Sequence, residues 1–123
     1  MQSGDTTITL GGASYAMRPT YGSLRDIESR TGMTARELLE VAMAERLRIE
    51  EAVFIIWYGA QAHSDQFDDV ERLGEVVFGE RLTSPALRSS ICKFLLGCLY
   101  APKVAAKKWD AEVAPIIEKT MTG

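Results

Sequence analysis

The stretch Thr6-Thr-Ile-Thr-Leu-Gly-Gly-Ala-Ser-Tyr-Ala-Met17 decides how this chain begins to fold. Two five-residue runs flank Gly11-Gly12, and a Gly-Gly pair suits a two-residue type I′ turn because both positions need a positive φ. The turn sets a register in which one face of the hairpin is apolar and the other is mostly polar. We therefore expect this hairpin to lie over a core. The facing pairs on the apolar side are Leu10 and Ala13, Ile8 and Tyr15, and Thr6 and Met17.

Helix signals follow the hairpin. Arg18-Pro19 ends the second strand because proline lacks the N–H that a ladder needs. Thr20 suits the N-cap of a short helix that Gly32 ends. Thr34 and Glu37 form a capping box, and Ser84-Pro85 is a strong helix start. The chain thus predicts helices over about 21–30, 35–45, 49–61, 66–78 and 85–101, with Ser64 or Asp65 capping the fourth.

The predicted fold class is mainly α (α+β): a two-stranded N-terminal β-hairpin packed on a bundle of about five helices. A chain of 123 residues is long enough for one core. Residues 1–101 are expected to hold the hairpin and the main helices. Residues 102–123 are expected to form a C-terminal helical extension of the same domain, broken at Pro115.

Composition limits the possible partners. A net charge of −3 offers no general attraction for nucleic acid. A small basic patch at Lys103, Lys107 and Lys108 keeps nucleic-acid binding open as an alternative. No apolar run is long enough to span a membrane and no signal peptide is visible, so a cytoplasmic protein is expected. Cys92 and Cys98 lack the spacing of redox or zinc motifs and are expected to be buried free thiols.

The sequence offers little for catalysis. His63 is the single histidine, and its neighbours Ser64 and Asp65 are consecutive residues, which seldom form a triad. The acidic residues near Asp68 lack the alternating ligands of a calcium loop, and they suit the first turn of a helix. We expect no catalytic, metal-binding or cofactor-binding residues and no cofactor, so the chain is predicted to bind proteins and not to be an enzyme.

Two predicted helices carry more apolar surface than a single contact face needs. They are either buried on several sides, or one of the two surplus patches contacts a partner protein. The candidate partner-binding residues are Phe54, Ile55 and Tyr58 on the helix over 49–61, and Cys92, Leu96 and Leu99 on the helix over 85–101.

Residues 8–32 resemble the opening of a family of small tail proteins from gene transfer agents and related tailed phages. The shared pattern is a hairpin with a glycine turn, a Met-Arg-Pro-Thr step at 17–20, and a short helix ending in Glu-x-x-Thr-Gly at 28–32. The resemblance covers the first third of the chain well and extends loosely to Tyr100, whereas the segment after Pro102 departs from it. The motif residues read as structural and none carries over as catalytic: Gly11, Gly12, Arg18, Pro19, Thr20 and Gly32.

The resemblance implies a role in building phage-type tails. The family carries the label of tail tube protein, but tube subunits of long-tailed phages are β-sandwiches. One hairpin with many helices agrees better with a tail assembly chaperone that binds the tape-measure protein or another tail protein, and itself as a possible homo-oligomer, in the host cytoplasm. The alternatives are a structural tail or head–tail connector component, and a small regulatory nucleic-acid-binding protein.

Overall fold

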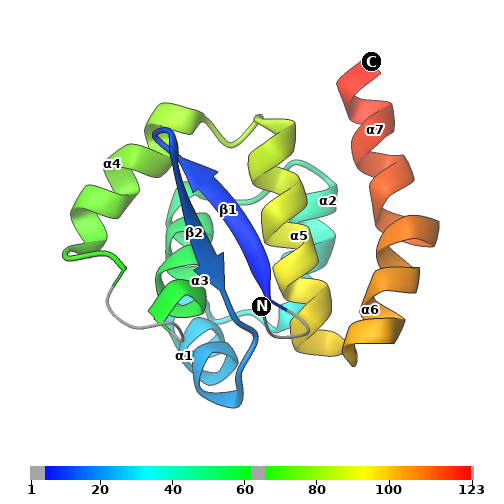
Figure 1. The fold of residues 1–123 in the computed structure, drawn as a ribbon, viewed down its shortest axis with the longest axis horizontal. Helices are drawn as coiled ribbons and strands as arrows, with labels where there is room; N and C mark the ends of the chain where they lie inside the picture. Colours follow the sequence, from blue (N-terminus) through cyan, green and yellow to red (C-terminus); the bar gives the residue numbers. More distant parts are fainter. Residues whose placement is uncertain (1–4, 62–65, 123) are drawn as a thin grey trace.

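The fold is a β-hairpin laid across a layer of helices (Figure 1). The computed structural model describes residues 5–61 and 66–122. The hairpin consists of β1 (Thr6–Leu10) and β2 (Ala13–Met17). The helices are α1 (Tyr21–Thr31), α2 (Ala35–Met43), α3 (Ile49–Gln61), α4 (Val70–Glu80), α5 (Pro85–Leu99), α6 (Pro102–Lys108) and α7 (Ala114–Thr122), with a π-helical turn η1 (Trp109–Val113) joining the last two.

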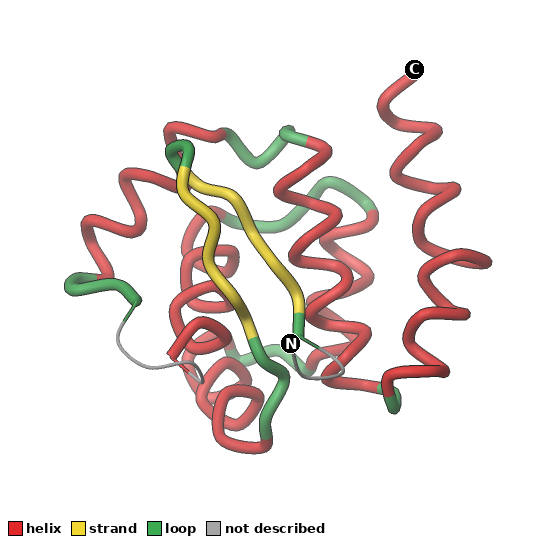
Figure 2. The backbone as a smooth tube through the Cα atoms, viewed as in Figure 1, coloured by secondary structure: helices red, strands yellow, loops and turns green. Residues whose placement is uncertain are grey.

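The hairpin has the register that the glycine turn predicts. Strands β1 and β2 pair antiparallel from Thr6 opposite Met17 to Leu10 opposite Ala13. Gly11 and Gly12 have φ values of 58° and 84°, which residues with a side chain rarely adopt. The apolar face lies over the helices and its Ile8 is buried, while Thr9 on the other face is exposed. Figure 2 shows both strands crossing the helical layer.

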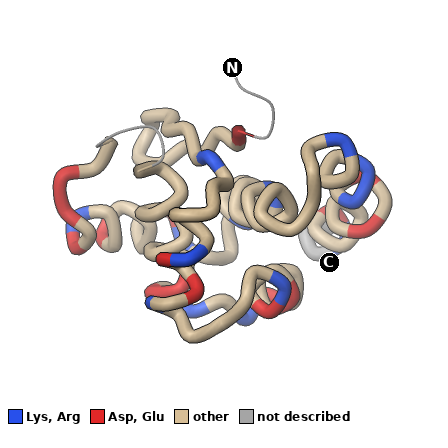
Figure 3. The backbone as a smooth tube through the Cα atoms, turned by 90° about the horizontal axis from the view of Figure 1, so that it is seen from below, with Lys and Arg blue, Asp and Glu red and all other residues tan. Residues whose placement is uncertain are grey.

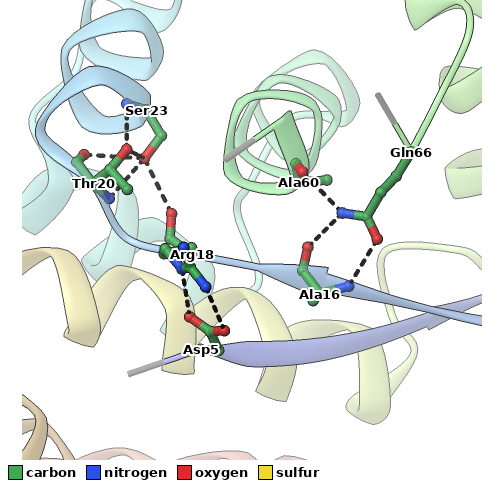
Figure 4. Close-up of polar contacts among 7 residues, drawn as sticks. All are labelled: Asp5, Ala16, Arg18, Thr20, Ser23, Ala60 and Gln66. Atoms are coloured by element: carbon green, nitrogen blue, oxygen red, sulfur yellow. Dashed lines mark hydrogen bonds and ion pairs between the residues drawn. The ribbon is translucent and has the colours of Figure 1, made fainter. Parts of the chain in front are cut away.

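Polar contacts fix the exit from the hairpin (Figure 4). The backbone N–H of Arg18 donates to the Gly59 carbonyl at 3.0 Å, and the guanidinium of Arg18 pairs with Asp5 at 3.1 Å. Thr20 caps α1 by accepting from the Ser23 N–H at 3.0 Å, and the Ser23 hydroxyl accepts from the Thr20 N–H at 3.0 Å. Gly32, with φ of 71°, ends the helix. The Arg-Pro-Thr step therefore holds the hairpin against α3 and starts α1.

The predicted starts of two later helices are confirmed, and a third is wrong. Thr34 and Glu37 form the capping box of α2, and Ser84 caps α5 with Pro85 at its first position. Helix α4 begins at Val70 with Asp69 as N-cap, later than predicted. The physical reason lies in Gln66, whose side chain bonds to both backbone polar groups of Ala16 and to the Ala60 carbonyl, and so ties this residue to the hairpin and to α3. His63, Ser64 and Asp65 lie outside the described residues.

The C-terminal segment does not break at Pro115. Helices α6 and α7 continue through η1, where the Ala114 N–H donates to the Trp109 carbonyl five residues earlier. Proline has no N–H to donate, so a wide turn directly before Pro115 lets the helix pass it. We call residues 102–122 the C-terminal helix. Counting it as one, the described residues form six helices, one more than the expected five.

Helices α3 and α5 form the centre of the core. Phe94 of α5 is fully buried and packs where α3 carries Gly59. A Cβ atom at Gly59 would lie 2.9 Å from the Phe94 ring, so the two helices approach as closely as glycine allows.

Within the described residues, no helix combines the length and apolar character that crossing a bilayer requires.

Candidate partner-binding surfaces

The first predicted patch divides between core and surface. Ile55 is fully buried, because the hairpin and the neighbouring helices cover that side of α3. Phe54 and Tyr58 are half-buried on the outer side, and their rings stack with centroids 6.3 Å apart. Of this patch, Phe54 and Tyr58 remain reachable by a partner, and Ile55 belongs to the core of the fold.

The second predicted patch is covered by the chain itself. Cys92 is fully buried and Leu96 is 2% exposed, while Leu99 is half-buried. Leu96 faces Leu39 of α2 and Val113 of the C-terminal helix across a shared hollow. The surplus apolar surface of α5 is therefore used inside the molecule, because α2 and the C-terminal helix both pack on it.

A groove opens between α3 and α4 where Phe54 reaches the surface. It has a volume of about 530 Å³, and we call it the α3–α4 groove. Two large apolar side chains at its edge are exposed, Phe78 by 60% and Ile49 by 36%. The residues that line it are Arg30, Ile49, Glu50, Val53, Phe54, Val70, Glu71, Gly74, Glu75 and Phe78. Exposed aromatic and aliphatic side chains gathered in one concave area are typical of a protein interface.

Charged side chains of both signs surround the α3–α4 groove. The guanidinium of Arg30 lies 4.7 Å from the centre of the Phe54 ring, and that of Arg81 lies 4.2 Å from the centre of the Phe78 ring. These cations cover parts of the two rings. Three carboxylates stand along the lining, those of Glu50, Glu71 and Glu75. Figure 3 shows acidic residues at the start of α4 at one end of the molecule, and both basic and acidic residues on the C-terminal helix at the other end.

Sequence reasoning did not find Phe78 and Ile49. Phe78 directly follows the buried Val77, so it falls beside the inner stripe of α4. Ile49 lies on the apolar stripe of α3, but it is the first residue of that helix, and its side chain is 36% exposed. An aromatic residue next to the inner stripe was the available signal for Phe78.

The hairpin edges are held by side chains of the same molecule. Gln66 donates to the Ala16 carbonyl at 2.8 Å and accepts from the Ala16 N–H at 3.2 Å, as a neighbouring strand would. On the β1 side, the Ser90 hydroxyl donates to the Thr7 carbonyl at 3.0 Å. Glu80 accepts from the Gly11 N–H at the turn. These bonds occupy backbone groups that a strand from another chain would need.

The two thiols lie in apolar surroundings. Burial raises the pKa of the Cys92 thiol to about 12, and burial likewise raises the pKa of Cys98 to about 12. Both are free cysteines; Cys92 is buried as expected, whereas Cys98 is only half-buried. Protonated thiols are poor nucleophiles and poor metal ligands, so the structure gives them the character of packing residues. Among residues 5–61 and 66–122 no group of three or more His, Cys, Asp or Glu could hold a metal ion.

The predicted basic patch is partly engaged. Lys108 pairs with Glu112 at 2.9 Å, and this hydrogen bond raises the pKa of Lys108. Its ammonium group also lies 5.5 Å from the centre of the Tyr100 ring. Lys103 and Lys107 are exposed. The patch thus offers two exposed lysines and one lysine tied to the helix that carries it.

A family model described as phage tail tube protein, GTA-gp10, matches residues 3–89. The chain belongs to this family. No curated protein and no solved structure shows a significant match to it.

The family match places the chain among phage tail proteins. The matched segment includes the hairpin, α1 to α4 and the first turn of α5, so it contains the whole α3–α4 groove. It ends before the C-terminal helix begins. The groove therefore lies in the part of the molecule that is shared with the tail family, whereas the cover over α5 lies outside it.

Proposed function

We propose that this chain is a tail assembly chaperone that binds an apolar segment of the tape-measure protein, or of another tail protein, in the α3–α4 groove. It acts by binding and without catalysis. The observation that carries the proposal is the groove itself, in which Phe78 stands 60% exposed beside Phe54 on a protein of a phage tail family.

The helical architecture supports a chaperone over a tube subunit. The described residues contain one sheet of two strands, and Gln66 and Ser90 hold polar groups at its two edges. A tube built from β-sheets needs sheet surface or strand edges to join its subunits. A groove between two helices is instead suited to an amphipathic helix, which places its apolar face into such a groove.

The lining of the groove defines the chemistry of the bound segment. Phe54, Val53 and Val70 favour aliphatic or aromatic side chains at its centre. The carboxylates of Glu50 and Glu71 favour lysine or arginine at the margins of the segment. We expect a helix with an apolar ridge and flanking basic residues, and binding that weakens as salt concentration rises.

Co-expression of the tagged full chain with a tape-measure fragment tests the proposal. The wild-type chain should retain the fragment on affinity purification, and the double variant Phe54→Ser/Phe78→Ser should bind it at least about tenfold more weakly, because aromatic side chains dominate interface energies. The control is Tyr21→Ser, which removes an aromatic residue that is 82% exposed on α1 and lies outside the groove lining. A wild-type chain that stays monomeric and ignores every tail protein of its operon would refute the proposal.

A structural tail component is the second candidate, because the family description names a tail tube protein. Mass spectrometry of purified particles separates the two roles. A chaperone leaves before the particle is complete and should be missing from it. A structural subunit should be present in many copies, and that result would favour the tube or connector role.

A further inference from the structure

The C-terminal helix covers an apolar surface formed by α2 and α5. It runs antiparallel to α5 along one side of the molecule (Figure 1). Leu96 of α5 and Leu39 of α2 are almost fully buried where this helix passes. We call this surface the α2–α5 groove; α2 and the end of α5 contribute Arg36, Leu39, Glu40, Met43, Leu96 and Tyr100, and the C-terminal helix faces them with Lys108, Glu112 and Val113.

The face of the C-terminal helix that lies in the groove has a simple pattern. Ala105, Trp109, Val113 and Ile117 follow one another at intervals of four residues, and this spacing aligns them on one side of a helix. Val113 and Ile117 are 2% and 3% exposed. Trp109 packs partly buried beneath the ammonium group of Lys93, which lies 4.8 Å from its ring centre. The pattern is an aromatic residue followed by two aliphatic residues, each four positions further on.

The same helix is attached through a narrow contact. Helix α6 has no buried residue, and Val104 is 44% exposed. A hollow of about 360 Å³ lies between the helix and the start of β1, and about 190 Å³ of the α2–α5 groove itself stays unfilled beside the helix. Only Tyr100 and Ala101 link it to α5, and Ala101 forms no side-chain cap. A helix that is held mainly by one stripe and flanked by hollows can leave without unfolding α3 or α5.

We propose that the α2–α5 groove is a second helix-binding surface and that the C-terminal helix occupies it as an internal ligand. A partner helix with the same stripe, an aromatic residue and two aliphatic residues at successive intervals of four, displaces it. The stripe of the internal helix is the template for the partner, because both must fill the space beside Leu96 and Leu39. The proposal does not depend on the chaperone role, which uses the other groove.

A labelled synthetic peptide of residues 102–122 tests this surface in the full chain. The variant Val113→Glu/Ile117→Glu puts carboxylates at the two most buried positions of the C-terminal helix, so its own helix should leave. Fluorescence anisotropy should show this variant binding the wild-type peptide at least about tenfold more tightly than the wild-type chain does. The matched control, Val104→Glu/Ile116→Glu, adds the same charges on exposed positions and should bind like the wild type.

Three results would overturn the proposal. The first is a folded Val113→Glu/Ile117→Glu variant, checked by circular dichroism, that does not bind the peptide. The second is a wild-type chain that binds the peptide as tightly as the variant does. The third is a wild-type dimer in sedimentation that the same substitutions abolish, because the groove would then belong to a second copy of this chain.

Hydrogen exchange of the wild-type chain gives an independent test that needs no variant to fold. Amides of residues 103–119 should exchange at least about tenfold faster than those of α3 and α5, and excess peptide should accelerate them further. Equal protection of the C-terminal helix and α5 would overturn the proposal.

Discussion

Helices α3 and α5 look alike in sequence but meet different surroundings. Each carries a run of apolar residues wider than one contact face. On α5 the surplus is covered, since Leu96 is buried between α2 and the C-terminal helix. On α3 the surplus is divided: Ile55 is in the core, and Phe54 lines an open groove beside the exposed Phe78.

The difference teaches what an apolar pattern can and cannot tell. The width of the stripe gives the amount of surface that must be buried somewhere. It does not say whether the cover comes from the same chain or from a partner, because that depends on where distant segments pass. Here residues 102–122 supply a cover for α5, and α4 crosses α3 so that a groove stays open.

The largest effect on stability should come from neighbours on α3. Ile55→Ala should lower the free energy of unfolding by about 2–5 kcal/mol, because it leaves a cavity in the core. Phe54→Ala should lower it by about 1 kcal/mol, since that ring is half-buried and already faces solvent. Urea denaturation measures both. Equal losses at the two positions would mean that the two sides of α3 are not different in the way described.

The hairpin and most helix starts were predictable from the sequence, because their signals are local. Gly11-Gly12 fixes the turn, and Thr20, Thr34 and Ser84 cap the helices that follow them. The start of α4 was not predictable. The side chain of Gln66 is hydrogen-bonded to Ala16 of β2, which lies fifty residues away in sequence, and the helix begins only after this contact. Local propensity cannot report such a partner.

The candidate surfaces were only partly predictable. Phe54 was found because it lies off the main stripe of its helix, and Leu96 was found for the same reason. Their fates differ because of the C-terminal helix, which the sequence predicted to break at Pro115. The π-helical turn that keeps this helix continuous depends on a backbone hydrogen bond from the Ala114 N–H to the Trp109 carbonyl. No residue pattern in the sequence predicts this bond.

Alanine substitutions at two glycines should have the next largest effects on stability, and they compare the closed α3–α5 contact with the open α3–α4 groove. Gly59→Ala should destabilise the fold by about 1–3 kcal/mol, because the added Cβ would lie 2.9 Å from the Phe94 ring in the closed layer between α3 and α5. Gly74→Ala is the matched control, since its Cβ would meet Val53 at 3.8 Å, an ordinary contact at the open groove. It should be neutral or stabilising by up to about 1 kcal/mol, because alanine favours helix. Thermal unfolding measures the stability of both variants. If Gly59→Ala is as stable as the wild type, the layer between α3 and α5 can relax to make room for the added Cβ.

The buried thiol on α5 predicts a pH dependence. The pKa of Cys92 is raised to about 12 in the folded chain, whereas an unfolded cysteine ionises near pH 8.5. Above about pH 9 the unfolded chain therefore binds fewer protons than the folded one, and stability falls as pH rises toward 12. This thiol contributes a slope of at most about 1.4 kcal/mol per pH unit. Denaturation of the wild type and Cys92→Ala between pH 8 and pH 11 should give a shallower decline for the variant, and parallel declines would mean that the thiol is already ionised or exposed.

The smallest effect on stability should come from Phe78→Ser, and it is the most informative about the open groove. Phe78 is 60% exposed, so its removal sacrifices little buried area. Its contact with Arg81 is an exposed cation–π pair, which contributes about 0.5–1 kcal/mol at most. The free energy of unfolding should change by no more than about 0.5–1 kcal/mol, while Leu73→Ala, a buried position on the same helix, should cost about 2–5 kcal/mol. A large exposed aromatic residue that does nothing for the fold and is nevertheless required to retain a tail protein would locate function at the α3–α4 groove. If Phe78→Ser instead destabilises the chain as much as Leu73→Ala does, the ring supports the fold, and the contrast between an open α3 face and a closed α5 face fails.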